Sequence, residues 1–367
     1  MNSSQIYGDA MSTGLLKPFN LGGMSLANRM VMAPLTRCRA AQGAISGSWA
    51  ATYYAQRASV GLIISEATII SPYAIGFSGV PGLYNQAQIE GWKVVTQAVH
   101  QAQGHIYAQL WHAGRASHPD FQPGATAPVA PSPIPISGTI RTPDGRQPYV
   151  TPRALATEEV PGIVEEYRQA ALNALYAGFD GVEIHAANGY LIDQFLRDGS
   201  NRRDDIYGGS VPNRLRFLLE IVEAISTVVE PARIGVRVSP AGAFNDMRDS
   251  DPQLLFDAVA GSLAGRGLAY LHVIERFREQ ADAPFNFVRI KRLFDGVYIA
   301  NGEYTLEIAQ DALTQQRADL ISFGRLMIAN ADLVERFRLK AELNMPDEST
   351  FYTGGSHGYI DYPELEG

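Results

Sequence analysis

The chain has 367 residues, a formal net charge of −8 and a single cysteine, Cys38. The acidic balance disfavours nucleic acid or an anionic membrane as the main partner, although a few local arginines can still bind an anionic cofactor. One cysteine excludes an intrachain disulfide framework or a cysteine-ligated cluster, and we find neither a secretory signal nor an apolar run of membrane-spanning length.

Short apolar runs alternate along the chain with longer amphipathic stretches. The predicted strands are 30–33, 62–66, 105–110, 181–185, 234–238, 270–273, 297–300 and 320–323, and the clearest predicted helices lie between them, at 89–103, 158–177, 211–228, 252–265 and 305–315. Strand–helix repetition of this kind indicates parallel strands, and eight such units predict a (β/α)8 TIM barrel. A doubly wound sheet is the rival fold, but the first predicted strand is not followed by the G-x-G-x-x-G turn that usually accompanies that fold.

The domain organisation follows from the same pattern. Residues 1–14 predict a flexible segment, and residues 15–367 predict a single barrel domain, which we expect to be soluble and cytoplasmic. One region, 115–157, breaks the rhythm: it is rich in Pro, Gly, Ser and Thr, has no clear period and follows the third strand. Long irregular insertions are usually functional or disordered, so we favour a loop that covers the substrate over an excursion without function.

The segment 185–191, His-Ala-Ala-Asn-Gly-Tyr-Leu, follows a predicted buried strand. The carboxyl end of barrel strands is where active sites lie. His185 and Asn188 can both donate hydrogen bonds to one oxygen, and Tyr190 can give up a proton. Together they could polarise a carbonyl and protonate a neighbouring carbon, although an isolated His-x-x-Asn is more often a helix-capping pair.

Two further features concern anion and metal binding. Gly302 and Gly324 follow the last two strands, where barrels usually bind phosphate, and Arg325 adds a positive charge, so the pair predicts a phosphate site rather than two ordinary turns. A hydrolytic metal centre would need several converging His and carboxylate ligands. His112 and His185 are the main imidazoles at predicted strand ends, so we predict no metal site.

The order of the motifs resembles the classical branch of the Old Yellow Enzyme family of FMN-dependent ene-reductases. The matching segments run from residue 16 to residue 363 and include 28–29, 32–37, 109–115, 185–191, 194–196, 201–210, 237–240 and 323–325. The resemblance implies non-covalent FMN at the barrel mouth and NAD(P)H as the reductant. The residues that it assigns to FMN are Ala33, Pro34, Leu35, Thr36, Ala67, Gln109, Arg237, Asn301, Gly302, Phe323, Gly324 and Arg325.

Within that set, the resemblance places Thr36 beside flavin N5, Gln109 at the pyrimidine edge, and Arg237 near N1 and O2, where reduced flavin carries negative charge. It assigns the substrate oxygen to His185 and Asn188, and makes Tyr190 the proton donor. Hydride would reach the β-carbon of an α,β-unsaturated carbonyl compound, imide or nitroalkene, and the resemblance adds Trp111, Phe77 and Tyr352 as pocket residues.

Several alternatives stay open at this stage. The same scaffold could break down nitrate esters or nitroaromatics, isomerise its substrate, or bind flavin with little turnover, and the chain could be a monomer or a homodimer. Trp111 and Tyr352 could belong to the core instead of the pocket. Phe77 stands where close relatives often have tyrosine, which leaves the substrate preference open. Cys38 lies two residues beyond the position at which another branch carries a flavin-facing cysteine, so we expect a buried, inert thiol.

Overall fold

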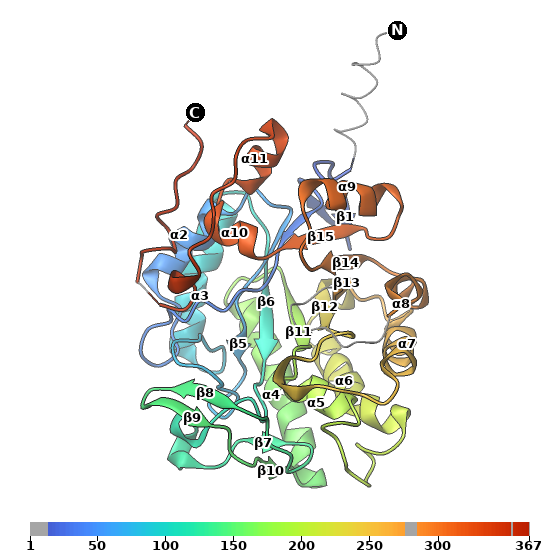
Figure 1. Ribbon diagram of the computed structural model, residues 1–367. Helices are drawn as coiled ribbons and strands as arrows, with labels where there is room; N and C mark the ends of the chain where they lie inside the picture. The colour runs from blue at the N-terminus through green and yellow to red at the C-terminus, as the bar shows by residue number, and fades with distance from the viewer. Residues whose placement is uncertain (1–13, 276–284, 354, 367) are drawn as a thin grey trace.

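The structure, a computed structural model, describes residues 14–275, 285–353 and 355–366 (Figure 1). Within these residues, parallel strands close into an eight-stranded barrel: β3 (Met30–Met32), β4 (Leu62–Ile64), β6 (Ile106–Trp111), β11 (Gly181–Ala186), β12 (Ile234–Val238), β13 (Tyr270–Ile274), β14 (Tyr298–Asn301) and β15 (Leu320–Phe323). β6 pairs with β11 and β15 pairs with β3, so the ring has no open edge. The predicted (β/α)8 barrel is confirmed, and all eight predicted strands are present with ends shifted by at most two residues.

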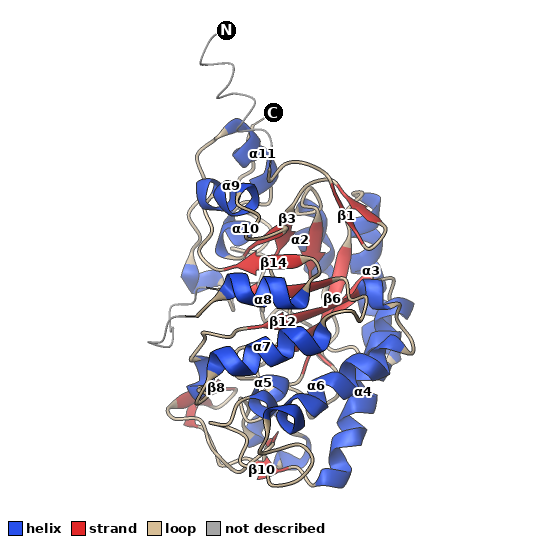
Figure 2. Ribbon diagram, turned by 90° about the vertical axis from the view of Figure 1, so that its right-hand side faces the viewer, coloured by secondary structure: helices blue, strands red, loops and turns tan. Residues whose placement is uncertain are grey.

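Helices surround the strands (Figure 2). The five predicted helices correspond to α3 (Gln86–Gln101), α4 (Val160–Tyr176), α6 (Val211–Ser226), α7 (Pro252–Leu263) and α9 (Leu306–Thr314). Polar side chains cap several of them: Asn85, Ser210, Asp251 and Thr305 each accept a hydrogen bond from a backbone N–H of the first turn, which satisfies a donor that the helix cannot use.

Other helices were not predicted: α2 (Ser48–Gln56), α5 (Leu191–Leu196), α8 (Phe287–Phe294), α10 (Arg325–Ala329) and α11 (Leu333–Leu339). In α2 the buried side includes Tyr53 and Tyr54 while Trp49 is exposed, so its sequence shows little contrast between an apolar and a polar face. Residues 1–13 of the predicted flexible segment lie outside the described residues.

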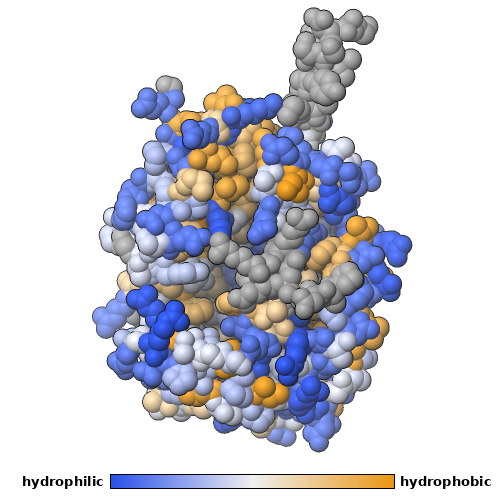
Figure 3. Space-filling model, viewed as in Figure 1, coloured by the Kyte–Doolittle hydropathy of each residue, from blue (hydrophilic) through white to orange (hydrophobic). Residues whose placement is uncertain are grey.

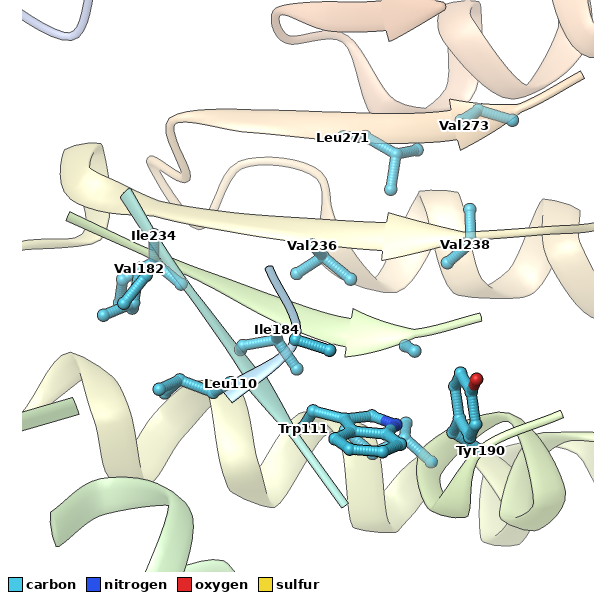
Figure 4. Close-up of a cluster of buried hydrophobic side chains, with 14 of the residues drawn as sticks. Leu110, Trp111, Val182, Ile184, Tyr190, Ile234, Val236, Val238, Leu271 and Val273 are labelled. Carbon is cyan, nitrogen blue, oxygen red and sulfur yellow. The ribbon is translucent and has the colours of Figure 1, made fainter. Parts of the chain in front are cut away.

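An antiparallel hairpin of β1 (Phe19–Leu21) and β2 (Met24–Leu26), which the sequence pattern did not reveal, lies across the barrel from the insertion strand β8 (Thr139–Thr142) in Figure 2. Leu21 and Leu26 pack in one buried cluster with the strand residues Val31, Leu62, Ile64, Tyr107, Tyr270, Ile299 and Leu320. A second, larger cluster includes Ile184, Val236 and Leu271 from the strands together with buried residues of the helices (Figure 4). The strands are therefore packed on both faces, as a parallel barrel requires.

The insertion is more regular than its sequence indicates. It contains β8 paired with β9 (Gly145–Pro148) as a hairpin, and β7 (Val129–Ala130) paired in parallel with β10 (Arg153–Ala154). The hairpin turns at Pro143 and Asp144, and the next residue, Gly145, has a φ of +105°. Arg115 fixes the insertion by donating to the carbonyl oxygens of Ile134 and Asn245, each at 3.0 Å. The insertion after the third strand is present as predicted, and its short strands were not visible in the sequence because short polar strands carry little hydrophobic alternation.

The outer surface is polar over most of the face drawn in Figure 3, with a smaller group of hydrophobic residues around α10 and α11. Within the described residues, no helix has the length and apolar character that a bilayer crossing demands. The same residues contain no cluster of three or more His, Cys, Asp or Glu side chains able to hold a metal ion.

Candidate active site

Several of the predicted site residues come from neighbouring strands and meet at the carboxyl end of the barrel. His185 on β11 lies in register with Arg237 on β12, and Asn301 ends β14. Trp111 ends β6, and Figure 4 shows it beside Tyr190 near the arrowhead of β11. The site is thus assembled by the register of the parallel strands, which brings together residues that are far apart in sequence.

Aromatic rings form a continuous wall at this end. The ring centroid of Tyr190 lies 5.1 Å from that of Trp111 and 5.0 Å from that of His185, with both pairs edge to face. Trp111 in turn stacks on Phe77, with 5.8 Å between centroids and 10° between planes. Such contacts fix the orientation of each ring, so the imidazole and the phenol are held in one arrangement.

His185 is 4% exposed, and its Nδ1 atom is buried without a hydrogen-bond partner within the described part of the chain. Burial lowers the pKa of His185 well below its usual value, and the nearby Arg237 and His272 act in the same direction. The imidazole is therefore neutral at physiological pH. A neutral ring carries one N–H, so it can donate a hydrogen bond to a ligand oxygen without adding a charge.

Asn188 has a φ of +58°, a left-handed conformation that asparagine adopts more readily than most residues. Two side chains from the loop after β12 hold its backbone: its N–H donates to Ser239 Oγ at 2.8 Å, and its carbonyl accepts from Asn245 Nδ2 at 2.9 Å. Gly189 follows with a φ of +71°, and a Cβ there would lie 2.7 Å from the side chains of Asn245 and Met247. Because the backbone makes these contacts, the Asn188 amide remains available for a ligand.

Tyr190 precedes α5 and is 8% exposed. Burial raises the pKa of its phenol, and the neighbouring Tyr149 and Tyr352 act in the same direction, so the hydroxyl stays protonated. His112, the other strand-end imidazole, has a different task. Burial lowers the pKa of His112 to about 3, and its Nδ1 accepts from the backbone of Gly114 at 3.0 Å, so it shapes the turn after β6.

Gln109 on β6 and Arg237 on β12 are both buried. Gln109 Nε2 donates to Glu183 Oε1 at 2.8 Å, and Arg237 Nη2 donates to Asn301 Oδ1 at 3.0 Å. Thr36, half-buried, follows β3 on the segment that also holds Pro34 and Leu35. The N–H of Ala33 donates to the carbonyl oxygen of Phe323 at 3.0 Å, which joins that segment to the end of β15. Ala67 is buried.

One of the predicted phosphate residues, Gly324, has room around it. Gly302 has a φ of +122°, and a Cβ at Gly324 would meet only Leu35 Cδ2, at 3.5 Å. Arg325, however, forms an ion pair with Glu348 at 3.2 Å, and both side chains are about half exposed (49% and 58%). An exposed pair of this kind is weak, so a phosphate can compete with Glu348 for the guanidinium.

Tyr352 and Cys38 lie on segments that Arg37 and Arg39 join. Both arginines donate to the carbonyl oxygen of Phe351, which fixes the carboxyl-terminal segment against the loop after β3. Tyr352 is 59% exposed, so it is not a core residue. Burial raises the pKa of Cys38 to about 12, and the residue is half-buried. The thiol therefore stays protonated at physiological pH, although the residue is half-buried and not buried as expected.

The site contains donors that fit a flavin. Three polar nitrogens in this part of the barrel are buried without a partner within the described residues: Trp111 Nε1, His185 Nδ1 and Arg237 Nε. Buried donors are normally satisfied, so unsatisfied ones close to one another indicate a bound molecule. Two of them carry a hydrogen whatever the tautomer of His185, and the oxygens and unprotonated nitrogens of a flavin ring or of a carbonyl substrate match that need. A barrel that offers donors and glycines of this kind at its carboxyl end fits a flavin-dependent oxidoreductase.

Comparisons with known proteins give the particular family. Residues 14–344 match the model of the NADH:flavin oxidoreductase / NADH oxidase family. The chain is 47% identical to 12-oxophytodienoate reductase 7 of Oryza sativa subsp. japonica, covering 96% of this chain and 94% of that protein, and 42% identical to a probable flavin mononucleotide-dependent alkene reductase of Leishmania infantum, covering 95% and 97%. The solved structure of morphinone reductase in complex with tetrahydroNAD is 49% identical and superimposes with a TM-score of 0.92, covering 96% of this chain and 98% of that one.

The chain therefore belongs to the Old Yellow Enzyme family of NADH:flavin oxidoreductases. The predictions of family, barrel fold and FMN cofactor are confirmed, and so is the class of enzyme, an NAD(P)H-dependent FMN ene-reductase. The residues that sequence reasoning missed are supporting ones: Ser239 and Asn245, which bond the Asn188 backbone, Glu183 beside Gln109, and His272, which bonds Glu183. Ser239 lies in a motif that pointed to the family, but only the folded chain brings it to Asn188.

Proposed function

We propose that the enzyme reduces carbon–carbon double bonds activated by a carbonyl, imide or nitro group, and that His185, Asn188 and Tyr190 carry the chemistry. The observation behind this proposal is the edge-to-face contact between a neutral imidazole and a protonated phenol at the barrel mouth. One group can donate to a substrate oxygen while the other donates to a carbon nearby.

His185 and Asn188 would bind the substrate oxygen. Their hydrogen bonds draw electron density onto that oxygen and make the β-carbon of the substrate electrophilic. In hydrolytic enzymes, one donor to a developing oxyanion contributes about 3–4 kcal/mol. The backbone contacts of Asn188 with Ser239 and Asn245 support this role, because they hold the residue in place before substrate arrives.

Tyr190 would protonate the α-carbon. Its raised pKa keeps the proton on the phenol at the pH of the cell, which a general acid requires before the reaction. Trp111 orients the ring through the edge-to-face contact, and Phe77 backs Trp111 by stacking on it. We propose that Trp111, Phe77 and Tyr352 line the substrate pocket, with Phe77 presenting a ring without a hydroxyl. The insertion, residues 115–157, would cover the substrate.

FMN, when bound, accepts a hydride from NAD(P)H and supplies it to the substrate. Thr36, Gln109 and Arg237 would hold its ring system, packed by Ala33, Pro34, Leu35 and Ala67. The ribityl phosphate would bind to Asn301, Gly302, Phe323, Gly324 and Arg325. The unpartnered Arg237 Nε supports the first assignment, and the open space around Gly324 supports the second.

A visible spectrum and a stopped-flow trace test the proposal. The purified protein, reconstituted with FMN, should show a flavin band that bleaches on mixing with NADPH and recovers on mixing with 2-cyclohexenone. Addition of a phenol should produce a long-wavelength charge-transfer band, because a phenolate oxygen occupies the place of the substrate oxygen. A protein that binds FMN but fails to recover its flavin band with the enone would refute the proposed activity.

We also propose a cytoplasmic enzyme that acts as a monomer or a homodimer. Its single cysteine, a protonated thiol, suits a reducing compartment, where disulfides are rare. Fractionation of cells and light scattering after size-exclusion chromatography test the two statements separately.

A further inference from the structure

Four polar side chains form a continuous chain of hydrogen bonds inside the barrel, on strands β6, β11, β13 and β15. Gln109 Nε2 lies 2.8 Å from Glu183 Oε1, Glu183 Oε2 lies 2.8 Å from His272 Nδ1, and His272 Nε2 lies 2.8 Å from Ser322 Oγ. All four residues are at most 2% exposed. A carboxylate and an imidazole at this depth are costly to bury, so their bonds have to be well satisfied.

The protonation states of these side chains determine which group donates and which accepts in each hydrogen bond. Burial lowers the pKa of His272, so its ring is neutral and has one N–H. A carboxylate only accepts hydrogen bonds, so the His272 proton lies on Nδ1 and faces Glu183 Oε2. Nε2 is then an acceptor, and the Ser322 hydroxyl donates to it. Donation therefore runs from Ser322 through His272 to Glu183.

The same reasoning fixes the orientation of the Gln109 amide. Because the carboxylate of Glu183 accepts, the Gln109 amide nitrogen must face it, and the amide oxygen points elsewhere. The backbone N–H of Gln109 is also held, at 3.0 Å from Ser65 Oγ. A terminal amide in solution flips freely between its two orientations, whereas here one is selected by a fixed acceptor.

We propose that Glu183, fixed by His272 and Ser322, is a positioning residue that makes Gln109 present its carbonyl oxygen, and not its NH2 group, to the flavin. This inference rests on the proposed assignment of Gln109 to FMN. The pyrimidine edge of an oxidised flavin has one donor, N3–H, between two carbonyl acceptors. An oriented amide oxygen would therefore select the N3–H group and set the register of the ring.

The test is the affinity of the apoprotein for FMN, measured by quenching of FMN fluorescence. Glu183→Gln keeps the size of the side chain but removes the obligate acceptor, so the Gln109 amide is no longer held in one orientation. Loss of one oriented hydrogen bond should weaken FMN binding by roughly three- to tenfold. Asp249→Asn is the matched control, because Asp249 is also a buried carboxylate, paired with Arg214 at 2.6 Å, but lies outside the barrel interior. It should leave FMN affinity within twofold of the parent.

A double-mutant cycle separates positioning from general loosening. In a Gln109→Met background, Glu183→Gln should have no further effect on FMN affinity, since its influence passes through the Gln109 amide. Additive losses, or a parent-like affinity of Glu183→Gln, would overturn the inference. If Glu183→Gln does not fold, Ser322→Ala replaces it, with a two- to threefold weakening expected in the same non-additive pattern. A parent apoprotein that fails to bind FMN would instead refute the proposed function.

Discussion

Replacing Tyr190 by phenylalanine removes one oxygen atom and should leave the aromatic wall intact. The ring contacts with Trp111 and His185, at 5.1 and 5.0 Å, do not use the hydroxyl, so the midpoint of thermal unfolding should hardly change. The substitution should slow proton transfer, a step that a positioned general acid accelerates about 10²–10⁴-fold. We expect enone reduction to slow by that factor in Tyr190→Phe.

Stopped-flow absorbance at the flavin band separates the two halves of the turnover. Bleaching by NADPH needs no proton from Tyr190 and should keep its rate, whereas recovery with 2-cyclohexenone should be slow. Recovery with a nitroalkene should be slowed less, because its anionic product is stable enough to be protonated by water. Since burial raises the pKa of Tyr190, the recovery rate of the parent should not fall through deprotonation of this phenol up to pH 10, the usual phenol value.

Tyr107→Phe is the matched control for this prediction. It removes a buried phenol oxygen from the cluster at the base of the barrel, and both halves of the turnover should keep their rates. Equal slowing of bleaching and recovery in Tyr190→Phe would refute the acid role, because it would indicate a defect in folding or cofactor binding.

Further predictions concern binding of the substrate oxygen, the flavin potential and the stability of the fold. The double variant His185→Ala, Asn188→Ala should retain FMN but lose phenol binding. A parent-like phenol affinity would contradict the assignment of these two residues to the substrate oxygen. Thr36→Ala should lower the flavin midpoint potential by roughly 30–60 mV, because a hydrogen bond to a charged group contributes about 1.5–3 kcal/mol; an unchanged or higher potential in a redox titration would contradict it. Burial raises the pKa of Glu66 to about 7, so the unfolded chain ionises this carboxyl before the folded protein does, and the free energy of unfolding falls as pH rises from 4.5 to 7. In urea unfolding, Glu66→Gln should therefore gain stability relative to the parent over that pH range. The hydrogen bond from Arg203 lowers the pKa of Asp205 from 3.8 to about 2, so Asp205→Asn should cost about 2 kcal/mol at pH 7, and this cost should shrink as pH falls from 4 to 2.

The sequence predicted the barrel because its strands are buried on both faces and its main helices are amphipathic, so each element leaves a clear local pattern. Elements without that contrast were not found. The β8–β9 hairpin is polar on most positions, and β1 and β2 have only three residues each. Their stability comes from what they pack against, which a local pattern does not contain.

The candidate site shows the same division. His185, Asn188 and Tyr190 were found because they lie within six residues of one another on one strand and the turn after it. Ser239 and Asn245 reach Asn188 from more than 50 residues away. Equally, the ion pair of Arg325 with Glu348 depends on how the carboxyl-terminal segment folds back. Long-range partners of this kind follow from strand register and loop path, and a single sequence does not encode them in any local motif.

The electrostatic state of the site explains why uncharged His185 and Tyr190 side chains suit this chemistry. His185 loses its charge through burial and Tyr190 keeps its proton through burial, so both groups are uncharged before the reaction. Dipoles fixed by packing bind an uncharged carbonyl only modestly, but they stabilise the negative charge that develops on its oxygen more strongly. A protonated imidazole would also bind anions in the ground state, and interactions made there do not lower the barrier of the chemical step. Burial of these two rings therefore directs their interaction energy to the step at which charge appears on the substrate.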